Sequence, residues 1–362
     1  MIKLVLVFYS DTMGRTKPSL GAPPAAQRKN IRAKRAKQTI SKDIPALLQA
    51  YPRARRGIEA SELITDITPS ALRNTDAKYE KKDPEHVEMH SKLPNLVLRM
   101  SDVLQVASDL IKSSRNSTVC ILNMASALRP GGGFLNGATS QEESLCMRST
   151  LYPALREEYY RLPELGGIFT PNVLVFQSAN GSDLPKAERF FVDVISAAML
   201  RDPDEGIRDG QKTYANVKDR GVVRRKMEAV LNIARSKNVR SLVVGAWGCG
   251  AFGNPIDEVA KAGRDVLLHS SESAWQDLHI EITIKERQTA LVFREAFDQE
   301  LELIADPDMA DSDKSDAEQD EGSGELASKV AELEKQIAAV RNPLLKQRLQ
   351  STLQKLREDE DG

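Results

Sequence analysis

The sequence has 362 residues, and its 51 basic and 52 acidic side chains nearly cancel to a net charge of −1. This length allows one core of about 150–280 residues with appended segments. The balance argues against a uniformly basic nucleic-acid binder, but it hides a split. Residues 1–60 carry 13 Lys and Arg against 3 Asp and Glu, whereas residues 298–325 carry 12 acidic residues against one lysine. The globular domain is therefore expected in the middle of the chain.

The cysteines and the apolar runs exclude further classes of protein. Cys120, Cys146 and Cys249 are widely spaced and form no CxxC pair, so neither a disulfide framework nor a zinc knuckle is predicted. A reducing, intracellular compartment is expected, cytoplasmic or nuclear. No apolar run approaches the roughly 20 residues of a membrane span. The short apolar start, MIKLVLVFY, stays open as a weak targeting element, an extra strand or an artefact of start-codon assignment.

The N-terminal part reads as a flexible lead-in over residues 1–27, rich in Pro and Gly from residue 11, followed by a helix over residues 28–50. Within that helix, RKNIRAKRAK has three interpretations: a nuclear import signal, a phosphate-contacting face, or an ordinary solvated helix face.

Periodicity predicts interleaved helices and strands through the middle of the chain, and hence a layered α/β domain over residues 28–300. A helix is expected over residues 95–113, directly after Pro94, with Leu96, Met100, Val103, Leu104, Ala107 and Leu110 on its apolar stripe. The strands are expected at 117–125, 168–177, 190–195, 241–247 and 279–284, and two more helices at 221–237 and 256–269.

Two appended segments follow the domain. Residues 301–325 are acidic and almost free of apolar residues after 305, which predicts a disordered linker. Residues 326–362 carry leucines and other apolar residues at heptad spacing, interrupted by Asn342-Pro343. They predict a helical, coiled-coil-like extension, either a hairpin or a kinked coiled coil. Self-association through it and docking onto the core are both open.

The chemistry-bearing residues concentrate after the strand that ends near Asn123. Three consecutive glycines, Gly131 to Gly133, follow Pro130, and the triplet QEE follows eight residues later at the start of a predicted helix. Glycines let a backbone approach a ligand in conformations that other residues avoid. The two glutamates have a simple alternative interpretation as first-turn acids that the helix dipole favours.

A second glycine loop, GAWGCGAFGNP at 245–255, follows the strand at 241–247. Its GCGAFG matches G-x-G-x-x-G by letter, but it lies late in the domain, its helix begins only after the last glycine, and no strand ending in an acidic residue follows about 20 residues on. A dinucleotide fold is therefore not predicted. Two glycine loops between strands and helices instead suggest a ligand whose pyrophosphate is held by backbone N–H groups.

The GGG and QEE motifs, Asn123, the loop GAWGCGAFGNP and the basic helix RKNIRAKRAKQTI together resemble the microbial-type poly(ADP-ribose) glycohydrolases over residues 28–300. The resemblance implies a macrodomain-like fold, with three layers (α/β/α) and a mixed central sheet. It makes the basic segment an N-terminal helix of the domain. The stretch VISAAMLRDPDEGIRDG at 194–210 departs from the family pattern, so ligand contacts from it are not implied.

The resemblance also implies roles for individual residues. Glu143 is the implied catalytic acid and Glu142 its partner on the ribose hydroxyls, while Asn123 would hold the distal ribose. The other implied ligand-binding residues are Gly131, Gly132, Gly133, Gln141, Gly248, Gly250, Ala251, Phe252 and Gly253. Phe252 has a second interpretation as a core plug.

The residue types suit hydrolysis of an O-glycosidic bond, in which a carboxylic acid protonates the leaving oxygen and its carboxylate then activates water. A neighbouring carboxylate is expected to raise the pKa of Glu143. No cofactor or metal is predicted, since His86 and His90 at i, i+4 lie in a polar segment.

Four functions are therefore compared, of which the fourth is scaffolding through the C-terminal heptads, an addition to catalysis rather than a replacement for it. The first is a glycohydrolase that releases ADP-ribose from poly(ADP-ribose), with the polymer and ADP-ribosylated proteins as partners. The second is an ADP-ribose reader without turnover, and the third a hydrolase of mono-ADP-ribosylated protein. The presence of both Glu142 and Glu143 favours an enzyme over a reader, since a reader needs only the glycine loops.

Overall fold

The computed structural model describes residues 25–65, 95–113, 118–208, 210–268, 275, 277–297 and 301–305. The predictions for the first 24 residues, for His86 and His90, and for the chain beyond 305 lie outside the described residues.

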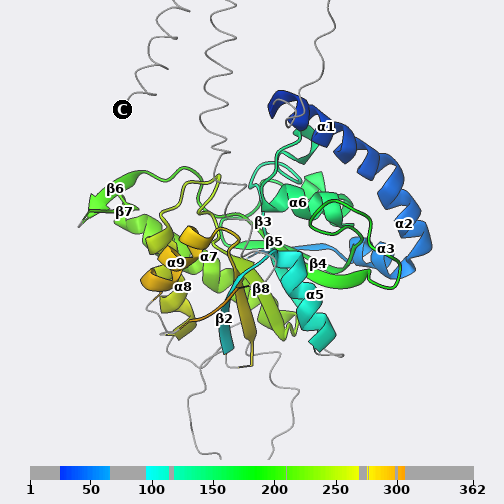
Figure 1. Cartoon of the computed structure of the whole chain (residues 1–362). Coiled ribbons are helices and arrows are strands. Elements are labelled where there is room, and N and C mark those ends of the chain that lie inside the picture. The colour runs from blue at the N-terminus through cyan, green and yellow to red at the C-terminus, as the bar shows by residue number, and fades with distance from the viewer. Residues whose placement is uncertain are drawn as a thin grey trace, which may run out of the picture.

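The centre of the fold is an eight-stranded mixed sheet (Figure 1). Strands β1–β4 and β4–β5 pair antiparallel, and every other neighbouring pair is parallel. In spatial order the strands are β1 (Glu62–Thr65), β4 (Gly166–Val175), β5 (Phe190–Ala197), β3 (Val119–Met124), β8 (Ser241–Gly245), β9 (His279–Thr283), β2 (Asn95–Met100) and β10 (Glu302–Ala305).

Helices cover both faces of this sheet, which makes the expected three layers (Figure 1). Strand β3 shows why, because all of its first five residues are buried. Cys120 and Leu122 pack toward α7 (Val217–Ser236), α8 (Ile256–Leu268) and α9 (Arg287–Ala296). Val119 and Ile121 pack toward α5 (Val103–Ser113) and α6 (Gln141–Arg148). A strand buried on both faces reads as a continuous apolar run, as this one does.

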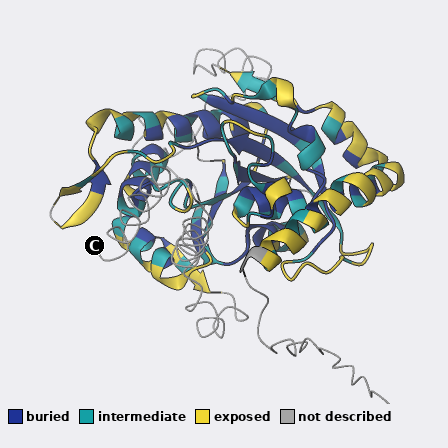
Figure 2. Ribbon diagram, turned by 90° about the horizontal axis from the view of Figure 1, so that it is seen from above, coloured by how far each residue is buried: buried dark blue, intermediate teal, exposed yellow. Residues whose placement is uncertain are grey.

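Three further helices form an arm at one side of the molecule (Figure 1). The chain runs from α1 (Ala25–Gln38) through a π-helical turn (Thr39–Asp43) into α2 (Ile44–Ala50), and then into α3 (Pro52–Glu59). This confirms the helical prediction for residues 28–50. Figure 2 shows the arm exposed on its outer side, whereas Ala36 and Ile44 are buried on its inner side. A small hairpin, β6 (Glu205–Arg208) and β7 (Gln211–Tyr214), lies at the opposite side of the view in Figure 1.

Two predictions need correction. Residues 95–113 are not one helix, because 95–100 form β2 between β9 and β10. The helix starts only at Val103, where Asp102 Oδ1 accepts the N–H groups of Leu104 and Gln105 and so caps it. Residues 302–305 form β10 at the sheet edge, although 301–325 was predicted as linker, and Leu301 is 2% exposed.

Candidate active site

The cleft that holds the predicted residues lies where three adjacent parallel strands end. Strand β3 pairs with β5 on one side and with β8 on the other, all parallel. Their following loops therefore meet at one edge of the sheet, where open α/β sheets bind ligands. The cleft measures about 700 Å³, a size that accommodates a dinucleotide-like molecule.

Glu142 and Glu143 lie in the first turn of α6 and are almost fully buried, at 3% and 7% exposure. Glu142 Oε2 accepts the N–H of Ser126 at 2.8 Å, and Glu143 Oε1 accepts the N–H of Gly133 at 2.7 Å. Both carboxyls therefore face the loop that follows β3 and line the cleft. Both glutamates do lie in the first turn of α6, as the simple interpretation expected, but they are buried and also face the cleft.

The glycine triplet makes room for these carboxyls. A Cβ added to Gly132 would lie 2.7 Å from Glu143 Oε1 and 2.8 Å from Glu142 Oε2, and the φ of Gly132 is +56°. Only glycine combines that backbone conformation with the required space. The N–H groups of Gly132 and Gly133 are already bonded, to the carbonyl of Arg129 and to Glu143. This loop therefore positions the acids rather than offering a row of free donors.

Gln141 joins the start of α6 to the end of β3. Its Oε1 accepts the N–H of Met124 at 2.8 Å, and its Nε2 donates to the carbonyl of Leu122 at 2.7 Å. The amide is thus occupied by backbone, although the residue lines the cleft. This bond pair holds the helix that carries both glutamates against the central strand.

The buried oxygen atoms that lack a hydrogen-bond partner among the described residues include Glu143 Oε2 and Asn123 Oδ1. The Asn123 amide donates to Ser196 Oγ at 3.0 Å and to Glu142 Oε1 at 3.5 Å. Unpartnered buried oxygens are costly, and they are typical of sites that bind a ligand hydroxyl. Asn123 does not itself line the cleft, but it lies directly behind Glu142.

Burial raises the pKa of Glu142 to about 8, and the charge of Glu143 adds to the effect, against hydrogen bonds from Ser126, Asn123 and Gly131. The pKa of Glu142 rises because the desolvation of this deeply buried carboxyl exceeds the benefit of its hydrogen bonds.

The second glycine loop is held from behind by Asn254, a buried residue. Its Nδ2 donates to the carbonyls of Leu200, Gly248 and Phe252, and its Oδ1 accepts from Tyr214. The N–H groups of Gly250, Ala251 and Phe252 make no hydrogen bond within the described residues, and these residues line the cleft. Consecutive unpaired N–H groups form an anion-binding surface.

Two arginines that sequence reasoning did not select also line the cleft, Arg129 and Arg201. The guanidinium of Arg201 lies 5.9 Å from the centre of the Phe252 ring, which is half-buried beside it. Arg201 follows β5, within the stretch where the sequence departs from the family pattern. The position of Arg129 next to the glycine triplet was a signal available in the sequence. Arg201 lies at the cleft only because β5 pairs with β3, which the sequence does not indicate.

The structure brings together most of the predicted site. Gly131 and Gly253 lie outside the cleft lining: Gly131 backs onto Tyr152, and the N–H of Gly253 closes a turn with Gly250. The lining residues among those predicted are Gly132, Gly133, Gln141, Glu142, Glu143, Gly248, Gly250, Ala251 and Phe252.

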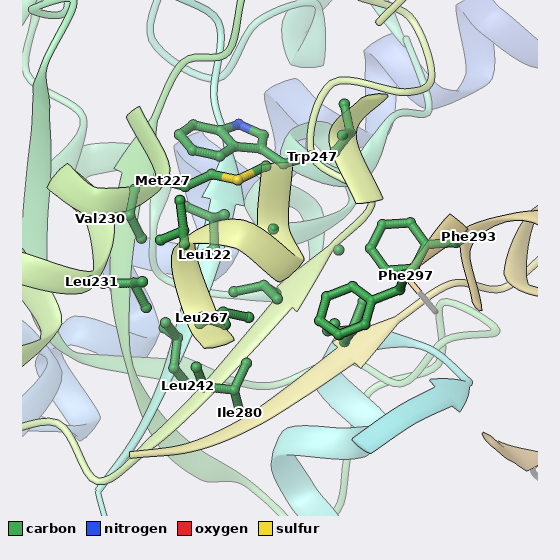
Figure 3. Close-up of a pocket in the computed structure, with 16 residues that line it drawn as sticks. Leu122, Met227, Val230, Leu231, Leu242, Trp247, Leu267, Ile280, Phe293 and Phe297 are labelled. Atoms are coloured by element: carbon green, nitrogen blue, oxygen red, sulfur yellow. The ribbon is translucent and has the colours of Figure 1, made fainter. Parts of the chain in front are cut away.

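A separate apolar cavity of about 70 Å³ lies behind the second loop, between the sheet and α7, α8 and α9 (Figure 3). Carbon atoms and the Met227 sulfur line it, with Phe293 and Phe297 on one side. Trp247 borders both this cavity and the cleft. The cavity presents no convergent polar groups, so it is not the site of the chemistry.

Within the described residues, no group of three or more His, Cys, Asp or Glu side chains could hold a metal ion. The same residues include no helix that is long and apolar enough to cross a membrane.

Comparison with known proteins gives a consistent family. Residues 59–178 match the model of the microbial-type PARG catalytic domain, where PARG is poly(ADP-ribose) glycohydrolase. The fold is similar to that of the poly(ADP-ribose) glycohydrolase from Thermomonospora curvata, with 24% identity, a TM-score of 0.56, and coverage of 75% of this chain and 99% of that one. The glycohydrolase from Deinococcus radiodurans, solved in complex with ADP-ribose, is similar at 25% identity and a TM-score of 0.52, with 69% and 98% coverage. No curated protein sequence matches.

Proposed function

We infer that this chain, whose residues 59–178 match the microbial-type PARG catalytic domain, hydrolyses the ribose–ribose O-glycosidic bonds of poly(ADP-ribose) to release ADP-ribose. The observation that carries the inference is the convergence of two buried glutamates and a loop of unpaired N–H groups on one cleft of about 700 Å³. An ADP-ribose unit has matching parts: a diphosphate for the N–H groups and a ribose for the carboxyls.

The diphosphate is assigned to the loop 248–253. The free N–H groups of Gly250, Ala251 and Phe252 donate to its oxygens, and Arg201 beside Phe252 supplies positive charge. Arg129 supplies a second positive charge from the other side of the cleft. The ring of Phe252 lies in the cleft lining and contacts the neighbouring ribose.

Glu143 is the acid and base of the reaction. Its Oε1 accepts the N–H of Gly133. Its Oε2 is buried, has no partner in the described part of the chain and faces the bond that breaks. Glu143 gives its proton to the leaving ribose oxygen as the bond from that oxygen to the anomeric carbon breaks. Water then attacks the anomeric carbon and returns a proton to Glu143. The negative diphosphate stabilises the positive charge that develops on the sugar.

Glu142 binds the ribose hydroxyls beside Asn123. Because its pKa is about 8, the Glu142 carboxyl is mostly neutral at pH 7 and is able to donate a hydrogen bond as well as accept one. The neutral form also places no full negative charge beside the Glu143 carboxyl. Gln141 is a positioning residue, since its amide holds α6 to β3.

Glu143→Gln tests the assignment. The amide keeps the size of the side chain and its acceptor for Gly133, but it has no proton to transfer to the leaving oxygen. Release of ADP-ribose from the polymer should fall by at least about 10²-fold, with ADP-ribose affinity retained. Calorimetric titration with ADP-ribose and chromatography of the products measure the two quantities.

The exposed Glu158→Gln is the matched control and should behave as the parent. Mono-ADP-ribosylated protein, assayed in parallel, separates polymer hydrolysis from removal of single units. Tight ADP-ribose binding by the parent without turnover of either substrate would favour a reader and contradict the enzyme assignment.

A further inference from the structure

The helical arm made of α1, α2 and α3 carries almost one kind of charge. Residues 25–59 contain ten lysines and arginines against two acidic residues, Asp43 and Glu59. Lys29, Lys34, Lys37 and Lys42 are exposed, and Figure 2 shows this side of the arm open to solvent. A concentrated, exposed surface of one sign raises the local concentration of polyanions.

The arm contacts the loop that positions the catalytic glutamate. Arg32 Nε donates to the carbonyl of Gly137 at 2.7 Å, and α1 packs so closely that a side chain at Gly137 would meet the Lys29 backbone. The chain from Gly133 to Gly137 is one short turn, and Gly133 bonds directly to Glu143. Only this turn separates the carboxyl of Glu143 from the basic helix.

We propose that the exposed basic face of this arm binds the part of the poly(ADP-ribose) chain that lies beyond the bond being cleaved. The proposal rests on the function proposed above. If the released unit occupies the cleft with its diphosphate on the loop 248–253, the rest of the chain begins at the leaving oxygen beside Glu143. That end of the cleft lies next to the turn on which α1 packs.

Charge supports this path. Every polymer unit carries two phosphates, and the described lining of the cleft contains two cations, Arg129 and Arg201. Arg201 is also paired with Asp202 at 3.2 Å, so the described lining leaves no surplus positive charge for a second unit. The phosphates of the remaining chain need other cations, and the arm supplies them at the matching end.

A second basic surface provides a control. Lys218, Arg224 and Arg225 line a shallow groove on α7, which covers the other face of the sheet from α6. Lys261 on α8 is exposed on that same side of the sheet. Neutralising cations there removes the same net charge without touching the arm.

The experiment uses the full chain with Glu143→Gln, so that the polymer stays intact. Lys34→Gln, Lys37→Gln and Lys42→Gln are combined as the arm variant, and Lys218→Gln, Arg225→Gln and Lys261→Gln as the control variant. Labelled long poly(ADP-ribose) and free ADP-ribose are titrated at several salt concentrations. The arm variant should bind the polymer roughly tenfold more weakly, with a shallower salt dependence, and ADP-ribose unchanged. The control variant should retain the affinity of the parent for both.

Three outcomes would overturn the proposal. One is an arm variant that binds the polymer as the parent does, and another is an equal loss in both variants, which reports net charge alone. The third is a result in which single-stranded DNA of matching length binds the arm as tightly as the polymer does, and the polymer does not displace it. Titration of the parent with ADP-ribose measures binding in the cleft alone. Failure to bind ADP-ribose would therefore contradict the proposed function, but not the proposal that the arm binds polymer.

Discussion

Glu142 and Glu143 are neighbours in the chain but have different surroundings. Glu143 keeps one buried oxygen without a partner among the described residues, whereas Glu142 lies deeper, between Ser126 and Asn123. Residue order alone predicted that the pair carries the chemistry, and the structure places both carboxyls at the cleft. Which carboxyl is the more desolvated depends on neighbours from β3 and its following loop, and sequence spacing does not report that depth.

The raised pKa of Glu142 leads to a prediction for stability. The carboxyl titrates near 4.5 in the unfolded chain and near 8 in the folded protein, so the folded state binds more protons between these values. The free energy of unfolding should therefore fall as the pH rises from about 5 to about 8, by roughly 2–4 kcal/mol from this group. Glu142→Gln should remove most of that fall. Thermal unfolding followed by circular dichroism across this pH range measures it.

Glu188→Gln, at an exposed position, is the control and should keep the slope of the parent. Parallel curves for the parent and the Glu142→Gln protein would show that Glu142 is not the group responsible.

At the scale of elements, the boundaries of β2 and α5 show what periodicity misses. The residues of 95–113 satisfy helical spacing, but 95–100 pair with β9 and β10 through backbone hydrogen bonds. Ser101-Asp102 was the available signal, since Asp is a favoured N-cap and here caps the helix. For β3, β5 and β8 the apolar runs were sufficient, because central strands that are buried on both faces leave little ambiguity.

The cavity behind the second glycine loop predicts a stabilising substitution in α8. Gly263 lines it, and a Cβ there would lie 3.7 Å from Phe297 Cε2, an ordinary van der Waals contact. Gly263→Ala should raise the free energy of unfolding by about 1 kcal/mol, from helix propensity and from partial filling of the cavity. Urea unfolding at fixed pH measures the change.

Gly221→Ala on α7 is the matched control, because a Cβ there meets nothing within 4 Å. It reports helix propensity alone, and its difference from Gly263→Ala gives the packing contribution. A Gly263→Ala protein less stable than the parent would contradict free space at this position.

At the scale of the whole molecule, the near-zero net charge is the sum of unlike parts. Most of the excess positive charge of the first sixty residues lies on the arm, which packs on the turn from Gly133 to Gly137. The excess negative charge lies in residues 298–325, at the C-terminal end of the domain and beyond it. The described lining of the cleft carries only two cations, Arg129 and Arg201. Binding of a diphosphate in the cleft would therefore depend on backbone N–H groups as well as on side-chain charge.

Chain truncation tests where the working domain ends. A chain of residues 1–308 should keep its activity and thermal stability, because every described residue of the cleft lies before 306. A chain of residues 1–299 should lose roughly 1.5–3 kcal/mol or more, since it lacks β10 and the buried Leu301, whose carbonyl accepts from Arg294. Polymer hydrolysis and urea unfolding measure both.

An inactive 1–308 chain would show that residues beyond 308 take part in the site. Equal stability of the two shortened chains would show that β10 adds nothing to the sheet.

Sequence by itself determined the strand–glycine loop–helix units, the glutamate pair that follows the first of them and the resemblance to a family. These signals are local, since a buried run, a glycine cluster and a motif lie within some twenty residues. Tertiary structure decided the rest. Arg201 enters the cleft only because β5 pairs with β3, and Asn254 shapes its loop through bonds to Leu200 and Tyr214. The arm reaches Glu143 only because α1 packs on Gly137. Each of these depends on contacts between residues some forty or more positions apart, whose energies no local pattern encodes.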